Sequence, residues 1–392
     1  MEKVLIVHTK YQHIGGEDIA VLNEYNFLKN KFIVDIIYFD NSKFNIFGLL
    51  KLLLFNVNHK SLNQLKLKLK EFNPDFIYVH NLWFNGSVRL LKYLVESDIN
   101  FALKLHNFRY NCTKNILSKN HIRSNTFCMG CGNKYNKSKI LNKYFKDSWL
   151  KSILVMRYGK SFFKILKSHS FPIFVLTDFH KRFLKSLGFN ENRITVLRNY
   201  INPQNFKTNT TPKTEKYIVY AGLVSKEKGV EDLIQAFKES KLISEGYKLK
   251  IIGSGPIFEN VKLQFQSSEV EFLGQLSNEI TLDIISKSEA VVTATKLYEG
   301  QPTLLCEATN LKVLSIFPNN GGIAEFFPPQ TKFKFTSNDY KTLRNKFDLL
   351  LDTQLVKEET MNNYEFLEKL IDEKYIFDQF SKAINKEISD AK

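Results

Sequence analysis

The sequence predicts an α/β protein built from two doubly wound domains, and three observations lead to this prediction. The chain has 392 residues, more than one compact core usually accommodates. Short apolar runs alternate with longer helical segments, a pattern typical of parallel sheets covered by helices on both faces. The series of apolar runs then starts again after a polar stretch that ends at Lys216, which indicates a linker.

Each half of the chain contains a series of expected strands, with helices such as 230–240 and 280–287 between them. In the first half the strands are expected at residues 3–8, 33–39, 75–80, 101–105 and 173–176. In the second half they are expected at residues 217–221, 248–252, 270–273, 290–293 and 312–316. We therefore predict one domain over residues 1–199, a second over 200–372, a C-terminal helix over 373–392, and a ligand cleft between the domains.

Composition excludes several other classes of protein. Apolar residues make up 43% of the chain and aromatic residues 14%, which is ample for burial and excludes disorder. Four cysteines are too few for the disulfide framework of a secreted domain. The chain starts with a strand rather than a signal peptide, and the apolar run 47–55 contains Lys51 and is too short to span a bilayer. We expect a cytoplasmic protein, or one that is peripheral on the inner face of the cell membrane.

The net charge of +16 is concentrated in the first half. Residues 1–200 carry 32 basic and 13 acidic side chains, whereas the rest carry 24 and 27. The basic excess is greatest between Lys104 and Arg198. Such asymmetry indicates an anionic partner or a solvated basic face, and the sequence leaves both open. We do not expect nucleic acid, because no binding module surrounds the charge.

The segment from Tyr298 to Ala308 is the most informative stretch of the second half. It follows an apolar strand and opens a helix. Pro302 suits the first position of a helix, because its missing N–H costs nothing there. The free amides of the next residues, Thr303 and Leu304, would then form a site for a phosphate group.

Two glutamates flank this helix start. Glu299 precedes it, and Glu307 lies more than one turn inside, roughly 6 Å along the axis from Thr303. One carboxylate can then contact a sugar and the other a ribose, with a diphosphate between them. Glycosidases also use paired carboxylates, but a phosphate-binding helix start between the two fits donor binding better than hydrolysis.

This segment resembles the family-4 retaining glycosyltransferases of the GT-B fold (bacterial surface-polysaccharide type), whose signature is two glutamates separated by seven residues. The resemblance implies two Rossmann-like domains that face a central cleft. It also implies that Glu299 contacts the transferred sugar, that Glu307 contacts the donor ribose, and that Pro302, Thr303 and Leu304 contact the donor. The expected donor is a UDP- or GDP-linked sugar, with retention of configuration and no required cofactor or metal.

A second loop, from Tyr220 to Val230, resembles the family's Gly-Arg-Leu…Glu-Lys-Gly loop, whose arginine and lysine hold the diphosphate. Lys228 matches the lysine, so the resemblance implies that it neutralises the leaving group. Leu223 stands where the arginine is expected, and this departure should weaken donor binding unless Lys226 or Lys296 substitutes. A solvated turn without a ligand is the alternative interpretation.

Other residues are assigned on weaker patterns. Gly253 ends a strand where the family packs the nucleotide base. Gly15 and Gly16 form a flexible loop before a helix start, which suits a phosphate. Three expected strands end in histidine, at His8, His80 and His106. Of these, His106 matches the family position that lines the reaction centre, so we group it with Glu299 and Lys228 as catalytic.

Three cysteines lie close together in the sequence, at Cys112, Cys128 and Cys131. Their spacing is compatible with a structural zinc site completed by His121 or His106, with reduced thiols that pack a loop, or with a disulfide. Some bacterial members of the family contain a similar stretch. The sequence leaves the three possibilities open.

Residues 137–170 are basic and aromatic. They predict an amphipathic helix that either lies on an anionic membrane or packs its apolar stripe in the core with solvated lysines. We favour membrane contact, because family members often use polyprenyl-diphosphate-linked acceptors.

The sequence as a whole predicts a glycosyltransferase that moves a hexose-type sugar to a glycan or lipid-linked acceptor in surface-polysaccharide biosynthesis. Three alternatives stay open: a catalytically degenerate GT-B protein that binds glycan or lipid, a sugar-nucleotide epimerase, and an inverting transferase. A dinucleotide dehydrogenase is disfavoured, because no Gly-x-Gly-x-x-Gly follows the first strand.

Overall fold

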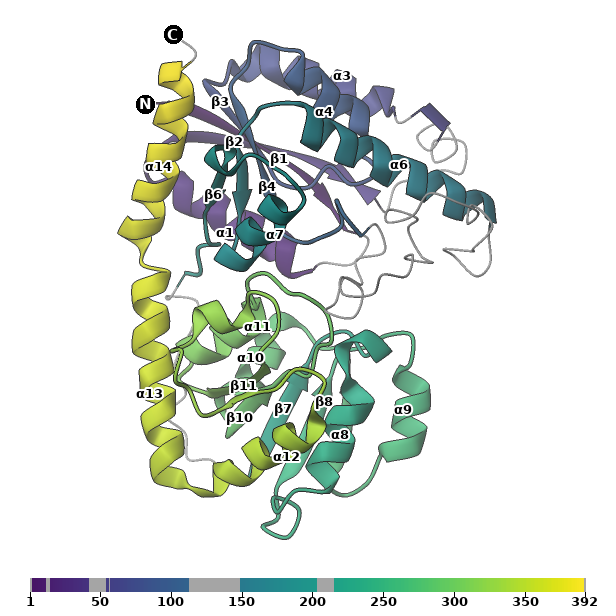
Figure 1. The fold of residues 1–392 in the computed structure, drawn as a ribbon, viewed down its shortest axis with the longest axis vertical. Coiled ribbons are helices and arrows are strands. Elements are labelled where there is room, and N and C mark those ends of the chain that lie inside the picture. The colour runs from purple at the N-terminus through teal and green to yellow at the C-terminus, as the bar shows by residue number, and fades with distance from the viewer. Residues whose placement is uncertain are drawn as a thin grey trace. The chain divides into compact units, whose positions relative to one another are not determined.

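The computed structural model describes residues 2–11, 15–41, 54–55, 57–112, 149–202 and 215–390 (Figure 1). The chain divides into two compact units. Unit 1 consists of Met1–Tyr200 together with Glu373–Lys392, and unit 2 consists of Ile201–Asp372. Each unit contains a six-stranded parallel sheet, so the predicted α/β class is confirmed.

The sheet of unit 1 has the strand order β2-β1-β3-β4-β5-β6. All neighbouring pairs are parallel, and β1, β3 and β4 are almost wholly buried, as continuous apolar runs predict. The strands are β1 Lys3–Lys10, β2 Ile33–Asp40, β3 Phe76–Val79, β4 Phe101–Leu105, β5 Ile173–Val175 and β6 Ile194–Val196.

The helices of unit 1 begin at recognisable capping residues. Asn58, Ser87 and Thr177 each accept a hydrogen bond from a backbone amide in the first turn of the helix that follows. The helices are α1 Gly16–Leu28, α3 His59–Phe72, α4 Val88–Val95, α6 Trp149–Ser168, α7 Asp178–Ser186 and α14 Glu373–Asp390, with the 3₁₀ helix η3 Glu191–Arg193.

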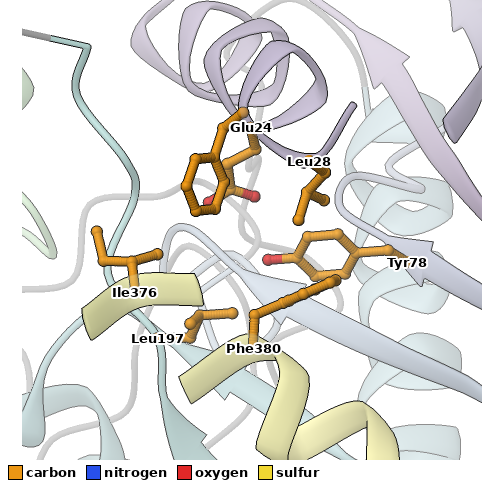
Figure 2. A pocket seen from close by; sticks show the side chains of 7 residues that line it. Glu24, Leu28, Tyr78, Leu197, Ile376 and Phe380 are labelled. Atoms are coloured by element: carbon orange, nitrogen blue, oxygen red, sulfur yellow. The ribbon is translucent and has the colours of Figure 1, made fainter. Parts of the chain in front are cut away.

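Helix α14, the last and yellow helix in Figure 1, packs into unit 1 although it follows unit 2 in the sequence. Its buried face consists of Ile376, Phe380 and Ile384. The Phe380 ring lies 5.1 Å from the ring of Tyr78 on β3, centroid to centroid. Figure 2 shows Ile376 and Phe380 on one side of a small hollow that is also lined by Glu24, Leu28, Tyr78 and Leu197.

The sheet of unit 2 has the strand order β12-β11-β10-β7-β8-β9, again with parallel neighbours. Its strands are β7 Tyr217–Ala221, β8 Lys248–Ile252, β9 Val270–Gly274, β10 Ala290–Val292, β11 Leu314–Pro318 and β12 Lys334–Phe335. Its helices are η5 Lys226–Lys228, α8 Val230–Lys238, α9 Phe258–Phe265, α10 Asn278–Ser286, α11 Thr303–Asn310, η6 Ile323–Phe326, α12 Tyr340–Asp348, η7 Leu349–Leu351 and α13 Thr353–Leu370.

The observed strands differ from the predicted ones mainly at their ends, with one instructive shift. The strand expected at 312–316 begins at Leu314, because the chain first closes helix α11. Lys312 adopts a left-handed φ of 56°, and the Val313 amide donates to the Ala308 carbonyl at 2.9 Å. Two strands, β6 and β12, were not predicted, since each is short and is interrupted by a polar residue, Thr195 in β6 and Lys334 in β12.

Within the described part of the chain, no helix combines the length and the apolarity that a bilayer crossing requires. The burial of side chains along helix α6 shows whether its apolar stripe packs in the core. Val155, Tyr158, Phe162 and Leu166 are buried in unit 1, whereas the basic side chains between them are exposed. From Val155 onward the stripe is therefore core; membrane contact stays a prediction for the exposed lysines, and residues 137–148 lie outside the described part.

Truncation of Phe380 to alanine should destabilise unit 1 by about 3–5 kcal/mol, because the change removes a fully buried ring from the contact with β3. Urea unfolding followed by fluorescence measures this loss. Lys382→Ala, which removes an exposed side chain from the same helix, is the control and should change stability by less than about 0.5 kcal/mol. Equal effects of the two substitutions would contradict the packing role of α14.

Candidate functional site

The structure brings Lys228 and Glu299 into direct contact in unit 2. Lys228 ends η5, after strand β7, and Glu299 lies in the loop after strand β10. The ammonium of Lys228 donates to Oε1 of Glu299, and the hydroxyl of Thr295 donates to the same oxygen at 3.1 Å. Both charged side chains are about 30% exposed, at 28% and 30%, so the pair can be reached from solvent.

Close backbone contact places these two residues side by side. Gly229 has a left-handed φ of 69°, and a Cβ there would lie 2.3 Å from the carbonyl oxygen of Ala294. The amide of Lys296 donates to the carbonyl of Glu227 at 2.9 Å. Only glycine permits this approach, so the loop of Lys228 is fixed against the loop of Glu299.

A third loop holds Glu299 from the other side. A Cβ on Gly321, whose φ is 61°, would lie 2.8 Å from both the amide nitrogen and the carbonyl oxygen of Glu299. The amide of Gly322 donates to that carbonyl at 2.9 Å, and Asn320 Nδ2 donates to the carbonyl of Leu297 at 2.6 Å. The Asn320–Gly322 loop, which the sequence marked only by its order, is thus a support for Glu299.

Helix α11 starts next to this loop. Its first residue is Thr303, so Pro302 stands just before the helix rather than in its first position as expected. The carbonyl of Pro302 accepts the first helical bond, from the amide of Cys306 at 3.0 Å. Pro302 has no side chain that could cap the first turn, so the amides of that turn are a candidate site for an anion.

Glu307 lies within α11 and is 7% exposed. Its carboxyl makes no hydrogen bond or ion pair to the residues that the structure describes. Burial raises the pKa of Glu307 to about 7. The group is therefore close to half protonated at neutral pH, and a hydroxyl-bearing ligand would supply the partner that it lacks.

Gly253 has a structural task that the sequence did not indicate. Its φ is 123°, and a Cβ would lie 2.0 Å from the carbonyl oxygen of Gly222. Close by, the amide of Val224 donates to the carbonyl of Ser254 at 2.9 Å. Gly253 therefore joins the β8 loop to the loop that contains Leu223, and its contact with a nucleotide base stays a prediction.

The two lysines that could replace the missing arginine differ in whether they already form an ion pair. Leu223 is 54% exposed. Lys296 forms an ion pair with Asp232 at 2.7 Å, so its charge is already neutralised. Lys226 is exposed and forms no ion pair within the described ranges. Of the two, Lys226 is the better placed to meet a phosphate.

In unit 1 the glycine loop leads into α1. Gly15 stands at the N-terminal cap and Gly16 is the first residue of the helix. The amide of Gly15 donates to Asp18 Oδ2 at 2.9 Å, and His8 Nε2 lies 2.8 Å from Asp18 Oδ1. The Gly15 amide is therefore taken by Asp18, so a phosphate contact by Gly15 or Gly16 stays a prediction.

His106 follows strand β4 and lines a pocket within unit 1. Its Nε2 lies 2.8 Å from Nδ1 of His80, and the two rings stack with centroids 5.1 Å apart. Burial lowers the pKa of both histidines well below the usual range, so both are neutral at pH 7. His80 and His106 thus act together, whereas His8 pairs separately with Asp18.

The same pocket contains residues that the sequence did not single out. Glu17 Oε2 accepts hydrogen bonds from the hydroxyl of Tyr11 at 2.8 Å and from Asn107 Nδ2 at 3.1 Å. Burial raises the pKa of Glu17. The guanidinium of Arg109 lies over the rings of Tyr11 and Trp83. In the sequence, these residues could be noticed only because they lie at strand ends and helix starts. That they come together in one pocket depends on the order of the strands in the sheet.

The cysteine stretch is described only at its start. Cys112 is buried, and Cys128, Cys131 and His121 lie outside the described residues. Within the described ranges, no group of three metal-ligating side chains comes together. The three interpretations of this stretch therefore stay open.

Comparison of the fold with solved structures gives a clear class. The chain has the GT-B fold. It is similar to a sucrose-phosphate synthase from Thermosynechococcus elongatus, with a TM-score of 0.73, 14% identity, and coverage of 98% of this chain and 99% of that one. It is also similar to HepE of Anabaena in complex with UDP-glucose, with a TM-score of 0.67, 13% identity, and coverage of 98% and 100%.

Sequence comparison points in the same direction. Residues 202–366 match the family described as "Glycosyl transferases group 1", so unit 2 contains a domain of this kind. The chain is also 26% identical over 233 residues to the capsular polysaccharide biosynthesis glycosyltransferase CapM of Staphylococcus aureus. That match covers 52% of this chain and 60% of CapM.

Gly253→Ala should destabilise unit 2 by several kcal/mol, because the added methyl group collides with the backbone of Gly222. Gly246→Ala is the matched control: Gly246 also has a positive φ, of 73°, but a Cβ there meets nothing within 4 Å. It should cost only about 1–2 kcal/mol. Thermal unfolding of both variants separates collision from backbone strain, and equal losses would contradict the close approach.

Glu307→Gln should change how the stability of unit 2 depends on pH. The folded pKa of about 7 lies above the usual 4.5, so wild-type stability falls as pH rises through this interval and is lower by about 3 kcal/mol above it. The variant should lack this fall and be the more stable protein at pH 8. Urea unfolding of unit 2 at pH 4.5 and pH 8 measures the difference, and parallel profiles would contradict the burial of the carboxyl.

Proposed function

We propose that the protein is a glycosyltransferase that binds a nucleotide-sugar donor in unit 2. The observation that carries this proposal is the accessible Lys228–Glu299 pair beside the uncapped start of α11. A diphosphate needs a cation and free amides, and a sugar needs a carboxylate that accepts hydrogen bonds from hydroxyls. The site offers all of these groups, in a unit that matches a glycosyltransferase family.

Lys228 and Glu299 would exchange partners when a donor binds. In the free protein they neutralise each other in a partly exposed contact, which typically contributes no more than about 1 kcal/mol. The ammonium of Lys228 can therefore move to the diphosphate while Glu299 accepts sugar hydroxyls. As the leaving group departs, Lys228 and the α11 amides stabilise the charge that develops on it.

Glu307 would accept hydrogen bonds from the donor ribose. A ribose hydroxyl favours the ionised carboxylate as acceptor, so donor binding should be accompanied by proton release around pH 7. The HepE structure contains UDP-glucose, and this supports UDP over GDP as the nucleotide. We propose a hexose as the transferred sugar.

The finer assignment follows the sequence resemblance. We propose a family-4 enzyme that retains configuration and requires no cofactor. The similarity to CapM supports a place in surface-polysaccharide synthesis, with a glycan or polyprenyl-diphosphate-linked acceptor. The exposed basic side chains of α6 would suit an anionic membrane surface, and we propose a location at the inner face of the cell membrane.

Leu223 favours a second candidate function, a degenerate GT-B protein that binds glycan or lipid without transfer. The alternatives of an epimerase and an inverting enzyme receive no support from a specific contact. Lys226 weighs against degeneracy, because it offers an uncommitted cation near the position of the missing arginine. Nucleotide binding distinguishes the candidates.

Isothermal titration with UDP, GDP, UDP-glucose and GDP-mannose tests the proposal. One nucleotide series should bind, and Lys228→Met should weaken its binding by about 10- to 100-fold, because an ammonium in contact with a phosphate contributes a few kcal/mol. Lys287→Met is the matched control. It breaks the exposed Lys287–Asp283 pair of α10 and should leave binding unchanged.

Two outcomes would count against the proposed donor site. If no nucleotide binds, the degenerate alternative is favoured. If Lys228→Met binds as tightly as Lys287→Met, the diphosphate is not held by the Lys228–Glu299 pair.

A further inference from the structure

Unit 1 contains a buried ion pair that the proposed donor site does not use. Lys104 on β4 is fully buried, and its ammonium donates to Glu24 Oε1 on α1. Lysine is almost never fully buried unless it is paired, and such a pair often contributes little net stability. The pair lies beside the pocket that His106 lines, and stability alone does not explain its presence there.

Polar contacts continue from this pair to the pocket. The second oxygen of Glu24, Oε2, lies 3.5 Å from Nε2 of His80. Nδ1 of His80 lies 2.8 Å from Nε2 of His106. The hydroxyl of Tyr78 faces the same carboxylate, and Figure 2 shows Glu24 and Tyr78 lining one hollow. Lys104, Glu24, His80 and His106 thus lie in series, here called the Lys104–His106 chain. Hydrogen bonds join its two ends, and in the middle Glu24 Oε2 and His80 Nε2 are buried atoms without another hydrogen-bond partner among the described residues.

The chemistry of each group determines where the protons lie along this chain. Burial raises the pKa of Glu24 and lowers that of Lys104, and the direct contact of the two groups opposes both shifts. We take the two groups as an ion pair because of that contact. A carboxylate can only accept hydrogen bonds, so the tautomer of His80 with its hydrogen on Nε2, 3.5 Å from Glu24 Oε2, is favoured over the one that places a lone pair there. A neutral imidazole has one N–H. Nδ1 of His80 is then an acceptor, and Nε2 of His106 must donate to it.

The geometry points to a positioning role for Lys104 and Glu24: through His80, they fix the ring tautomer of His106, so that its Nδ1 is a hydrogen-bond acceptor for a substrate hydroxyl. His106 is half-buried and lines the pocket. Its Nδ1 has no hydrogen-bond partner among the described residues. The opposite tautomer would present an N–H there and could not accept a hydroxyl hydrogen.

The chemical class of the ligand follows from this tautomer. An acceptor nitrogen beside Glu17 and the aromatic ring of Trp83 suits a polyhydroxylated ring rather than a carboxylate or phosphate, which would be repelled by an unprotonated imidazole. The identification of this ligand as a sugar in a transfer reaction rests on the proposed function. The assignment of the His106 tautomer is independent of the proposed function.

Nitrogen-15 NMR of the histidine rings in the full-length chain tests the assignment directly. Long-range correlation spectra report which ring nitrogen carries the hydrogen, and substitution of single histidines by asparagine assigns the signals. We expect both His80 and His106 to be protonated at Nε2 and unprotonated at Nδ1 near pH 7. A hydrogen on Nδ1 of His106 would overturn the inference, without any variant at Glu24.

Glu24→Gln should reverse the chain. The amide oxygen of the new side chain would stay with the Lys104 ammonium, and its NH₂ group would donate to Nε2 of His80. Both histidines should then carry their hydrogen on Nδ1, and transfer to the acceptor should fall at least about tenfold through loss of one hydrogen bond. Glu96→Gln, at an exposed carboxylate of unit 1, is the control and should change neither tautomer nor rate.

The outcomes are distinct. A folded Glu24→Gln protein with unchanged tautomers would overturn the inference. If that variant does not fold, the wild-type spectrum still decides. If the protein binds no nucleotide but shows the expected tautomers, the proposed function fails and the positioning role of Lys104 and Glu24 stands.

Discussion

Four loops of unit 2 meet backbone against backbone, and the position of every charged group in the candidate site depends on these contacts. Gly229 approaches the carbonyl of Ala294, Gly321 approaches the backbone of Glu299 itself, and Gly253 approaches the carbonyl of Gly222. Backbone contacts of this kind leave little freedom for the loops to move. The backbones that carry Glu299 and Lys228 are thus positioned by the scaffold, while their side chains can exchange partners.

The two candidate sites each contain a lysine–glutamate pair, and the two pairs differ in their exposure to solvent. In unit 2 the accessible pair of Lys228 and Glu299 is weak and can exchange its partners for those of a ligand. In unit 1 the pair of Lys104 and Glu24 is buried, and in the arrangement we propose its influence passes to a ligand through His80 and His106. The exposed Lys228–Glu299 pair can therefore bind a ligand directly, whereas the buried Lys104–Glu24 pair orients His106.

Much of the fold could be predicted from the sequence, because buried parallel strands are continuous apolar runs. The ends of α11 show the limits. Pro302 lies just outside the helix, and the left-handed turn at Lys312 delays the next strand, since both depend on local dihedral angles. The sequence singled out Lys228, Glu299 and Glu307 because each lies within a short local motif, and their contacts with a donor stay a prediction. The pairing of Lys104 with Glu24 joins residues 80 positions apart and could not be predicted without the order of the strands.

Helix α14 has a consequence for how the molecule is made. Unit 1 encloses the whole of unit 2 in the order of the chain, so a ribosome completes unit 2 before it synthesises the residues that finish unit 1. Until then Tyr78 and the neighbourhood of Glu24 lack the side chains of Ile376 and Phe380 that line the same hollow (Figure 2). The nascent chain therefore carries an unfinished apolar surface while unit 2 is synthesised, and helix α14 closes it afterwards.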